Sequence, residues 1–221
     1  MRDKQIQERK LLDQLNTIID RDIRLIYPTT LSFSQIFEYL KELALLEGHP
    51  LQYSHLEKKV KISDVTQKKI LYALEAVFLI RIIPLKGGKK NFTIRLEDQA
   101  ESFYLRSLEL KKEKNNIIEL EGLLYRHLRC QFMYHLGFNF NLFQYQTRGG
   151  ARVPIVIDSA ERTLGFIVIE EEIPNRSELA TATSFYKEYS NSSIIFVPFT
   201  DKSQPAIVNH RSMIIPLKYF L

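Results

Sequence analysis

The stretch Tyr145–Ile173, YQTRGGARVPIVIDSAERTLGFIVIEEEI, decides the expected fold of this chain. Its apolar residues form two strand-length runs separated by a short polar segment at residues 159–163, which predicts two antiparallel strands joined by a turn. The segment 147–150, TRGG, forms a tight turn before the first strand. We therefore expect a β-hairpin at the centre of the second half of the chain.

Two neighbouring strands can build a metal site when the first bears an acid and the second an acid-x-lysine. Mg²⁺ prefers carboxylate oxygens, and the lysine steadies the attacking water. Here the first strand has Arg152 and Pro154 where an acid is required, and the second reads Val168-Ile169-Glu170. The hairpin therefore resembles the frame of a PD-(D/E)XK nuclease site that has lost its catalytic groups.

Length and composition predict an ordinary globular protein. The chain has 221 residues, of which 45% are hydrophobic and 26% charged, so it has room for one large domain or two small ones. No apolar run approaches the roughly 18–20 residues that a membrane span requires, and the N-terminus lacks a signal-peptide core. We expect a cytoplasmic protein with no membrane partner.

The candidates for metal, nucleotide and covalent chemistry are few. The single cysteine, Cys130, fits a reducing cytosol, and we expect it to be a small buried hydrophobe of a helix rather than a nucleophile. The five histidines show no metal-ligand spacing, and the chain contains no G-x-x-x-x-G-K-[ST] motif. We therefore expect no cofactor and no metal site, and we interpret the acidic run 170–172 as a solvated strand edge.

The positive charge is local. The net charge is +5, whereas residues 54–95 contain ten basic and three acidic residues and so carry +7, which leaves −2 for the remainder. Such an asymmetry favours an anionic partner for this segment.

The first half of the sequence predicts helices followed by a hairpin. Residues 1–30 form an N-terminal helical segment, whose apolar stripe over residues 3–25 has to pack either on the next domain or on a domain absent from this chain. Residues 31–108 form a winged-helix domain, with a helix to about residue 46, a short helix N-capped by Ser54, and a helix 64–78 capped by Ser63. The strands 79–85 and 91–96 form the wing.

The second half predicts an α/β arrangement. Residues 97–115 read as a charged helix or connection, and within this stretch residues 109–116, ELKKEKNN, are the best candidate linker. A long helix follows from 117 to about 135, then three strands, a helix at about 177–189 and a strand at 193–199. The expected fold class is α+β, with N-terminal helices and a winged helix-turn-helix followed by a restriction-endonuclease-like domain at residues 109–221.

The winged helix supplies the candidate nucleic-acid contacts. Its second helix would enter the major groove and its wing would touch phosphates. Lysines suit phosphate contact, whereas no arginine or asparagine on that helix is available to read base edges, so we expect non-specific binding to double-stranded DNA. The alternative is a protein-docking or spacer domain with a solvated lysine face. The candidate residues are Thr66, Gln67, Lys68, Lys69, Lys86, Lys89 and Lys90.

The order of these pieces resembles the C-terminal half of a prokaryotic AAA-type ATPase family, over nearly the whole chain. In that family a P-loop ATPase precedes a winged helix and a PD-(D/E)XK-like domain of unknown function. The resemblance implies an ATPase domain as partner. The chain is then either a piece of a longer protein that contains this domain or a stand-alone remnant. The N-terminal stripe favours a piece of a longer protein. The matching pieces are Asp20-Arg21-Asp22-Ile23, residues 40–48 (LKELALLEG), Ile62 to Thr66 leading to Leu74-Glu75, Thr147 to Gly150, and Ile214 to Leu217 before the terminal Leu221.

The departures from the family pattern argue against catalysis. The family's Gly-x-Glu-Val-Asp falls on residues 150–154 and ends at Pro154, which can neither ligate a metal nor donate to the sheet. Its Glu-Val-Lys falls on residues 168–170, so Val168 and Glu170 replace an acid and a lysine, and its helical glutamate falls near Tyr125.

Three functions follow as hypotheses. The first is a non-catalytic binding or coupling module of an AAA-type ATPase that contacts DNA or a protein. The second is a divergent metal-dependent nuclease using Asp158, Glu170 and Glu172, and the third is a purely protein-interacting domain. In the third case the exposed N-terminal stripe predicts a protein partner or a homodimer.

Overall fold

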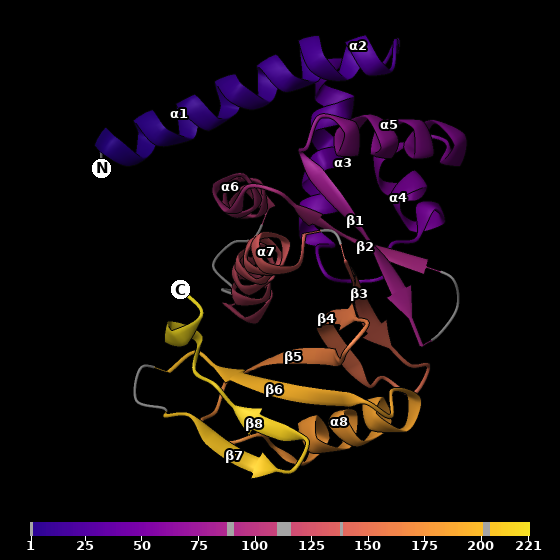
Figure 1. Ribbon diagram of the computed structural model, residues 1–221. Helices are drawn as coiled ribbons and strands as arrows, with labels where there is room; N and C mark the ends of the chain where they lie inside the picture. Colours follow the sequence, from indigo (N-terminus) through magenta and orange to yellow (C-terminus); the bar gives the residue numbers. More distant parts are fainter. Residues whose placement is uncertain (1, 88–90, 110–115, 138, 201–203) are drawn as a thin grey trace. The chain divides into compact units, whose positions relative to one another are not determined.

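The protein folds into two compact units of mixed α and β structure (Figure 1). The computed structural model describes residues 2–87, 91–109, 116–137, 139–200 and 204–221. The first unit comprises Met1–Ile82 and Thr93–Lys114, and the second comprises Ile83–Phe92 and Asn115–Leu221. The expected α+β class is confirmed. Residues 1–30 belong to the first unit rather than standing apart, and the expected linker lies mostly outside the described residues.

The N-terminal helices bury their apolar stripe within the first unit. Leu15, Ile19 and Ile23 are fully buried, because this segment packs against α3 (Phe33–Leu45), α5 (Asp64–Ala76) and α6 (Gln99–Glu109). The prediction that this part of the stripe is open to a partner or homodimer is therefore wrong. The segment consists of α1 (Arg2–Thr17), the π-helical η1 (Ile18–Ile23) and α2 (Arg24–Ile26).

The helices and strands expected between residues 31 and 96 follow one another along the chain. Between α3 and α5 lies α4 (Tyr53–Val60), and α5 leads into β1 (Ile80–Lys86) and β2 (Asn91–Leu96). The Ser63 side chain accepts a hydrogen bond from the Thr66 backbone N–H and so caps α5 as predicted. The predicted cap of α4 is wrong, because α4 begins one residue before Ser54 and has no side-chain cap.

The helix α6 completes the core of the first unit instead of forming a loose connection. The buried carboxylate of Glu47 accepts hydrogen bonds from the Leu96 backbone N–H at 2.7 Å and from the Ser102 hydroxyl, so it joins the end of β2 to α6. On the same helix, Glu101 is 2% exposed and accepts a hydrogen bond of 3.1 Å from Gln14 of α1.

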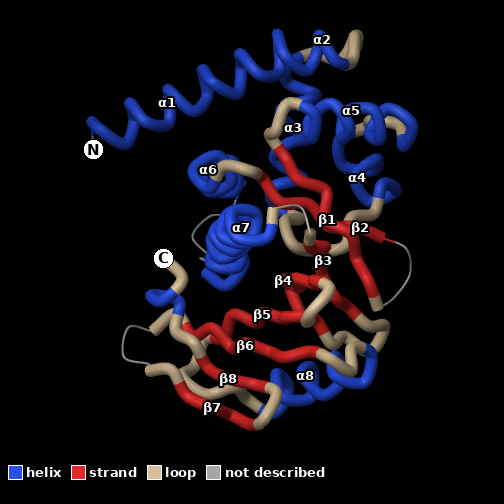
Figure 2. Tube along the Cα trace, in the orientation of Figure 1, coloured by secondary structure: helices blue, strands red, loops and turns tan. Residues whose placement is uncertain are grey.

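The second unit contains a mixed sheet (Figure 2). Within this unit the strand order is β1-β3-β4-β5-β6-β8-β7, where β1 contributes its end from Ile83 onward and pairs in parallel with β3. The predicted hairpin with its turn at residues 159–163 is confirmed as the antiparallel pair β4–β5. The elements are α7 (Asn116–Leu136), β3 (Phe140–Gln146), β4 (Arg152–Ser159), β5 (Thr163–Ile169), α8 (Arg176–Glu188), β6 (Ser192–Pro198), β7 (Ala206–Asn209), β8 (Ser212–Ile214) and η2 (Leu217–Tyr219).

Alternate residues of the central strands face two different helices. Along β5, Phe166 and Val168 pack in the core cluster that contains Leu124 of α7. Their neighbours Ile167 and Ile169 pack in the cluster that contains residues of α8. Because side chains alternate across a strand, α7 and α8 cover opposite faces of the sheet.

The outer face of α7 carries the single cysteine. Cys130 is exposed, and the neighbouring Tyr134 is 86% exposed. The prediction of a buried cysteine is wrong, because Cys130 lies two residues beyond the buried Leu128 and therefore about 200° around the helix. No helix in the described part of the chain is long and apolar enough to cross a membrane.

Candidate functional site

The outward face of α5 collects two lysines and two exposed apolar residues. Val65 is 64% and Tyr72 69% exposed, and Lys68 and Lys69 are also exposed. The spacing of three and four residues places all four on one side of the helix. Lys58 and Lys61 are exposed on α4 and in the turn before α5. We call the surface formed by these six residues the α5 surface.

Both helix lysines are held by neighbouring side chains. The Lys68 ammonium lies 3.0 Å from an Asp64 carboxylate oxygen and 5.2 Å from the ring centroid of Tyr53. The Lys69 ammonium lies 5.7 Å from the ring centroid of Tyr27. The side chains of Lys68 and Asp64 are about half exposed, at 55% and 48%, so their ion pair is weak enough to be exchanged for a phosphate.

Gln67 does not belong to this surface. It is fully buried, and its amide nitrogen donates hydrogen bonds to the backbone carbonyls of Tyr53 at 3.2 Å and Ile62 at 2.7 Å. The prediction that Gln67 contacts nucleic acid is therefore wrong, because it joins α5 to α4 and the turn between them. Thr66 is half-buried and takes part in the helix cap, where its hydroxyl lies 3.0 Å from that of Ser63.

The predicted contacts of the wing are only partly described. Lys86 is exposed and belongs to the second unit, where its ammonium lies 3.9 Å from the ring centroid of Phe143. Lys89 and Lys90 lie outside the described residues. Lys86 therefore contacts an aromatic ring of its own unit.

In the second unit an ion pair lies at the start of β4, the strand whose residues were compared with those of a nuclease site. The two terminal guanidinium nitrogens of Arg152 on β4, Nη1 and Nη2, donate to the two carboxylate oxygens of Glu121 on α7, each at 2.7 Å. The Glu121 side chain is 2% exposed and that of Arg152 26%. A cation of the protein itself thus holds the buried acid that faces this end of the hairpin.

The four positions compared with catalytic groups carry no metal-binding pair. Tyr125 on α7 and Val168 on β5 are buried in the core cluster between this helix and the sheet, at 2% and 5% exposure. Pro154 is buried beside the shift of the β3–β4 register, where a strand tolerates a missing N–H donor. Glu170 is exposed just beyond the end of β5.

The alternative metal site is contradicted by the register of the hairpin. Asp158 pairs with Thr163 beside the turn, and its carboxylate accepts a hydrogen bond of 2.7 Å from the Thr163 hydroxyl. Glu170 lies seven residues further along β5, which corresponds to roughly 20 Å. Asp158 therefore cannot share an ion with Glu170 and Glu172. No group of three or more His, Cys, Asp or Glu residues positioned to hold a metal occurs within the described ranges.

Polar residues that the sequence analysis missed surround the ion pair. Gln146 is the register partner of Arg152, and Gln144 lies two residues before it on the same face of β3. The amide nitrogen of Gln144 is buried without a hydrogen-bond partner among the described residues. The sequence contains a sign that Glu121 is buried, because it lies between Ile118 and Tyr125 at the spacing of one helical face.

A comparison with known families matches the N-terminal part of the chain. Residues 1–105 match a family described as a domain of unknown function (DUF8612), and this match covers slightly less than half of the chain. The comparison with curated proteins found no match.

Proposed function

We propose that this chain is a non-catalytic binding module that contacts double-stranded DNA through the α5 surface, without sequence preference. The observation that carries the proposal is the two-sided character of α5. Its buried side holds Ile70, Leu71 and Leu74 in the core, whereas its opposite side presents Lys68 and Lys69 to solvent. The second helix of a helix-turn-helix is the element that approaches the major groove.

The residue types of the α5 surface favour phosphate contact over base reading. Lysine ammonium groups act as point charges toward phosphate oxygens. Base edges are read by arginine, asparagine or glutamine, and the single glutamine of this helix, Gln67, is committed to backbone carbonyls. Binding is therefore expected to depend on salt and to differ little between sequences.

The proposal includes the absence of nuclease chemistry. The buried acid Glu121 near this hairpin is paired with Arg152 of the chain itself, and proline stands at position 154. In a longer protein with a P-loop ATPase, as the family resemblance implies, the module would hold DNA while the ATPase uses nucleotide. A metal or nucleotide cofactor is not part of the proposed role of this chain.

Fluorescence anisotropy of a labelled DNA duplex at several salt concentrations tests the proposal. The wild-type chain should bind at low salt and weaken as salt rises. The double variant Lys68→Gln/Lys69→Gln should reduce the slope of log K against log salt by about 2, because each phosphate-contacting lysine contributes about 1. The charge reversal Lys68→Glu/Lys69→Glu should abolish binding.

The control is Arg9→Gln/Lys10→Gln, which removes the same charge from an exposed part of α1 in the same unit. This variant should keep the wild-type slope. Equal losses in the two neutral double variants would mean that net charge, and not the α5 surface, causes the binding. An absence of wild-type binding at low salt would overturn the DNA proposal.

A protein partner is the second candidate for the same surface. Val65 and Tyr72 expose apolar area beside the lysines, and exposed aromatic residues are enriched where proteins meet. If DNA does not bind, an acidic protein segment with apolar side chains becomes the expected ligand. The variant Tyr72→Ser would then weaken that interaction more than Lys69→Gln.

A further inference from the structure

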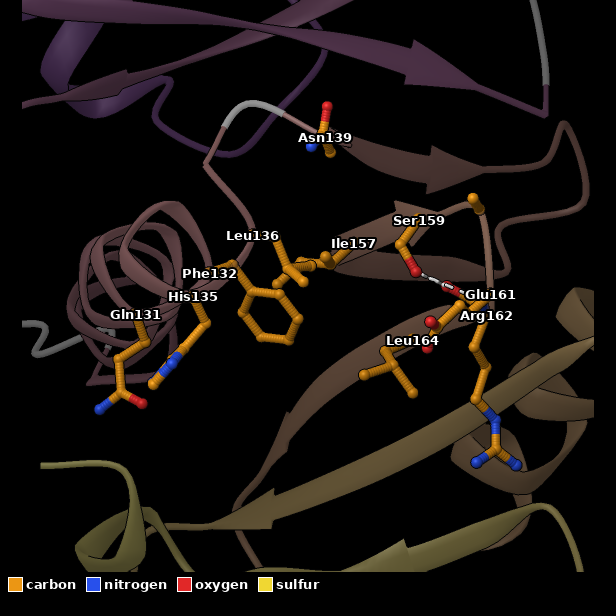
Figure 3. A pocket seen from close by; sticks show the side chains of 11 residues that line it. Gln131, Phe132, His135, Leu136, Asn139, Ile157, Ser159, Glu161, Arg162 and Leu164 are labelled. Atoms are coloured by element: carbon orange, nitrogen blue, oxygen red, sulfur yellow. Dashed lines mark hydrogen bonds between the residues drawn. The ribbon is translucent and has the colours of Figure 1, made fainter.

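A pocket of 590 Å³ opens in the second unit between the last turns of α7 and the turn that joins β4 to β5 (Figure 3). Pockets that take small molecules typically have volumes of about 300–1,000 Å³ and are mainly apolar. The pocket is separate from the ion pair of Glu121 and Arg152, since neither residue lines it. It is also independent of the α5 surface, which belongs to the first unit.

The middle of the pocket is apolar. It is lined there by Phe132 and Leu136 from α7 and by Ile157 and Leu164 from the hairpin. Ile157 is buried in the core, whereas Leu136 is 38% exposed at the end of its helix. The Phe132 ring is tilted by 59° against that of Phe140 at 6.0 Å, which fixes its position. The pocket therefore offers an apolar surface on which a flat ring can rest.

Polar groups stand on its two sides. In Figure 3, Gln131 and His135 project from α7 on one side, and Ser159, Glu161 and Arg162 stand at the turn on the other. Glu161 is the only carboxylate among the described lining residues. The Arg162 side chain is directed away from the apolar residues in this view.

The turn holds Glu161 in place through its backbone. The Glu161 carbonyl accepts a hydrogen bond of 2.7 Å from the Asn191 side chain. The next residue, Arg162, is tied by its backbone to Ser159, whose hydroxyl and N–H donate to the Arg162 carbonyl at 3.0 and 3.1 Å. The carboxylate is therefore carried by a fixed turn at the rim of an apolar pocket.

We propose that this pocket binds small aromatic amines, with the ring against Phe132, Leu136 and Leu164 and the protonated amine beside Glu161. A carboxylate favours a cation at this rim, and the apolar lining favours a ring over a hydrated polar group. His135 and Gln131 offer hydrogen-bonding groups on the opposite side of the ring.

The composition of the chain allows a direct binding measurement. It contains no tryptophan, so an indole ligand can be excited at wavelengths that tyrosine does not absorb. The anisotropy of the ligand then reports its own binding to the 26.0 kDa chain. Three probes share the ring and differ in charge: tryptamine is cationic, indole-3-ethanol neutral and indole-3-acetate anionic.

The expected order of affinity is tryptamine, then indole-3-ethanol, then indole-3-acetate. Tryptamine should bind about 2- to 5-fold more tightly than the neutral probe, which is the size of effect of an exposed ion pair. The variant Glu161→Gln should remove this preference and leave the affinity for the neutral probe unchanged. The matched variant Arg162→Gln, in the same turn, should retain or increase the preference.

The contribution of the apolar lining is tested with Leu136→Asn, a change at a partly exposed helix end that leaves the core intact. This variant should weaken all three probes. The proposal is overturned if none of the probes binds, if the three bind equally, or if indole-3-acetate binds most tightly. Tryptamine binding that is unchanged in both Glu161→Gln and Leu136→Asn would place the amine elsewhere and would also overturn it.

Discussion

The guanidinium of Arg152 on β4 donates two parallel hydrogen bonds of 2.7 Å to the carboxylate of Glu121 on α7. The bidentate geometry matches the planar fork of arginine to the two oxygens of the acid. The Glu121 side chain is 2% exposed, so the ion pair is largely shielded from solvent on the side of the acid. The pair therefore links the long helix to the sheet.

Removal of Arg152 alone should destabilise the second unit strongly. The variant Arg152→Ala removes the bidentate cation from a buried carboxylate, and breaking a buried ion pair on one side typically costs about 3–5 kcal/mol. The expected result is a large fall in the thermal midpoint of the second unit, measured by calorimetry. Its amides in α7 and β4 should also exchange faster with deuterium.

The control for this prediction replaces both partners. The double variant Glu121→Leu/Arg152→Leu removes the charges together, and buried pairs replaced in this way are often neutral in stability. It should therefore be more stable than either single variant. A double variant less stable than Arg152→Ala would show that the pair contributes more than the cost of removing the cation from Glu121.

Gln67→Ala should loosen the helix-turn-helix without removing any charge. The variant leaves the carbonyls of Tyr53 and Ile62 without the donor that they share, which costs about 1–3 kcal/mol for a buried site. Hydrogen exchange measured by mass spectrometry over residues 53–67 should become faster. The neighbouring change Lys69→Ala should alter stability by no more than about 0.5 kcal/mol. Equal exchange in the two variants would contradict the structural role of Gln67.

The stability of the first unit should decline as pH rises toward neutrality. Burial, with a smaller contribution from the Asp98 charge, raises the pKa of Glu101 to about 7. Because this pKa is above the unfolded value of 4.5, the folded state favours the proton, and the associated stability is lost as pH rises through about 7. Glu101→Gln should remove this dependence and be more stable than wild type at about pH 8, by up to about 3 kcal/mol.

Chemical denaturation of both proteins across this pH range provides the measurement. Glu57→Gln, which changes an exposed acid of the same unit, should keep the wild-type profile. A Glu101→Gln protein whose stability still falls between acid and neutral pH would assign the dependence to another group.

Gly165 should not tolerate a side chain. A Cβ at this position of β5 would lie 2.5 Å from Ile194 Cδ1 and 3.0 Å from Val153 Cγ1, with Phe185 of α8 at 3.3 Å. Gly165→Ala should therefore destabilise the second unit by about 1–3 kcal/mol through overpacking. Gly149→Ala should change stability little, since its Cβ would meet only Thr147 Oγ1, at 3.8 Å. Comparison of the two calorimetric midpoints tests the difference.

Local pattern was sufficient for much of the fold. The alternation and turn residues of 145–173 predict the β4–β5 hairpin, which the register confirms. The apolar spacing after Ser63 predicts α5, and its cap is present. Both signals depend on residues within a few positions of one another, and so they can be read along the chain.

Three properties of the candidate sites required the tertiary structure. Gln67 is of a residue type that is usually found at the surface, yet it is buried because α4 and the following turn present carbonyls to it. Asp158 and Glu170 are close in sequence, but an extended strand separates them. Leu136 and Glu161 come to line one pocket because a helix and a hairpin meet there.

The sequence by itself determined the periods of helices and strands, the local positive charge and the absence of acid and lysine at the compared positions, since these depend on residue type and near neighbours. The tertiary structure alone decided that Arg152 binds Glu121, 31 positions earlier in the chain. The physical reason is that burial and long-range pairing depend on which elements pack together. That packing joins residues whose separation in sequence carries no periodic signal.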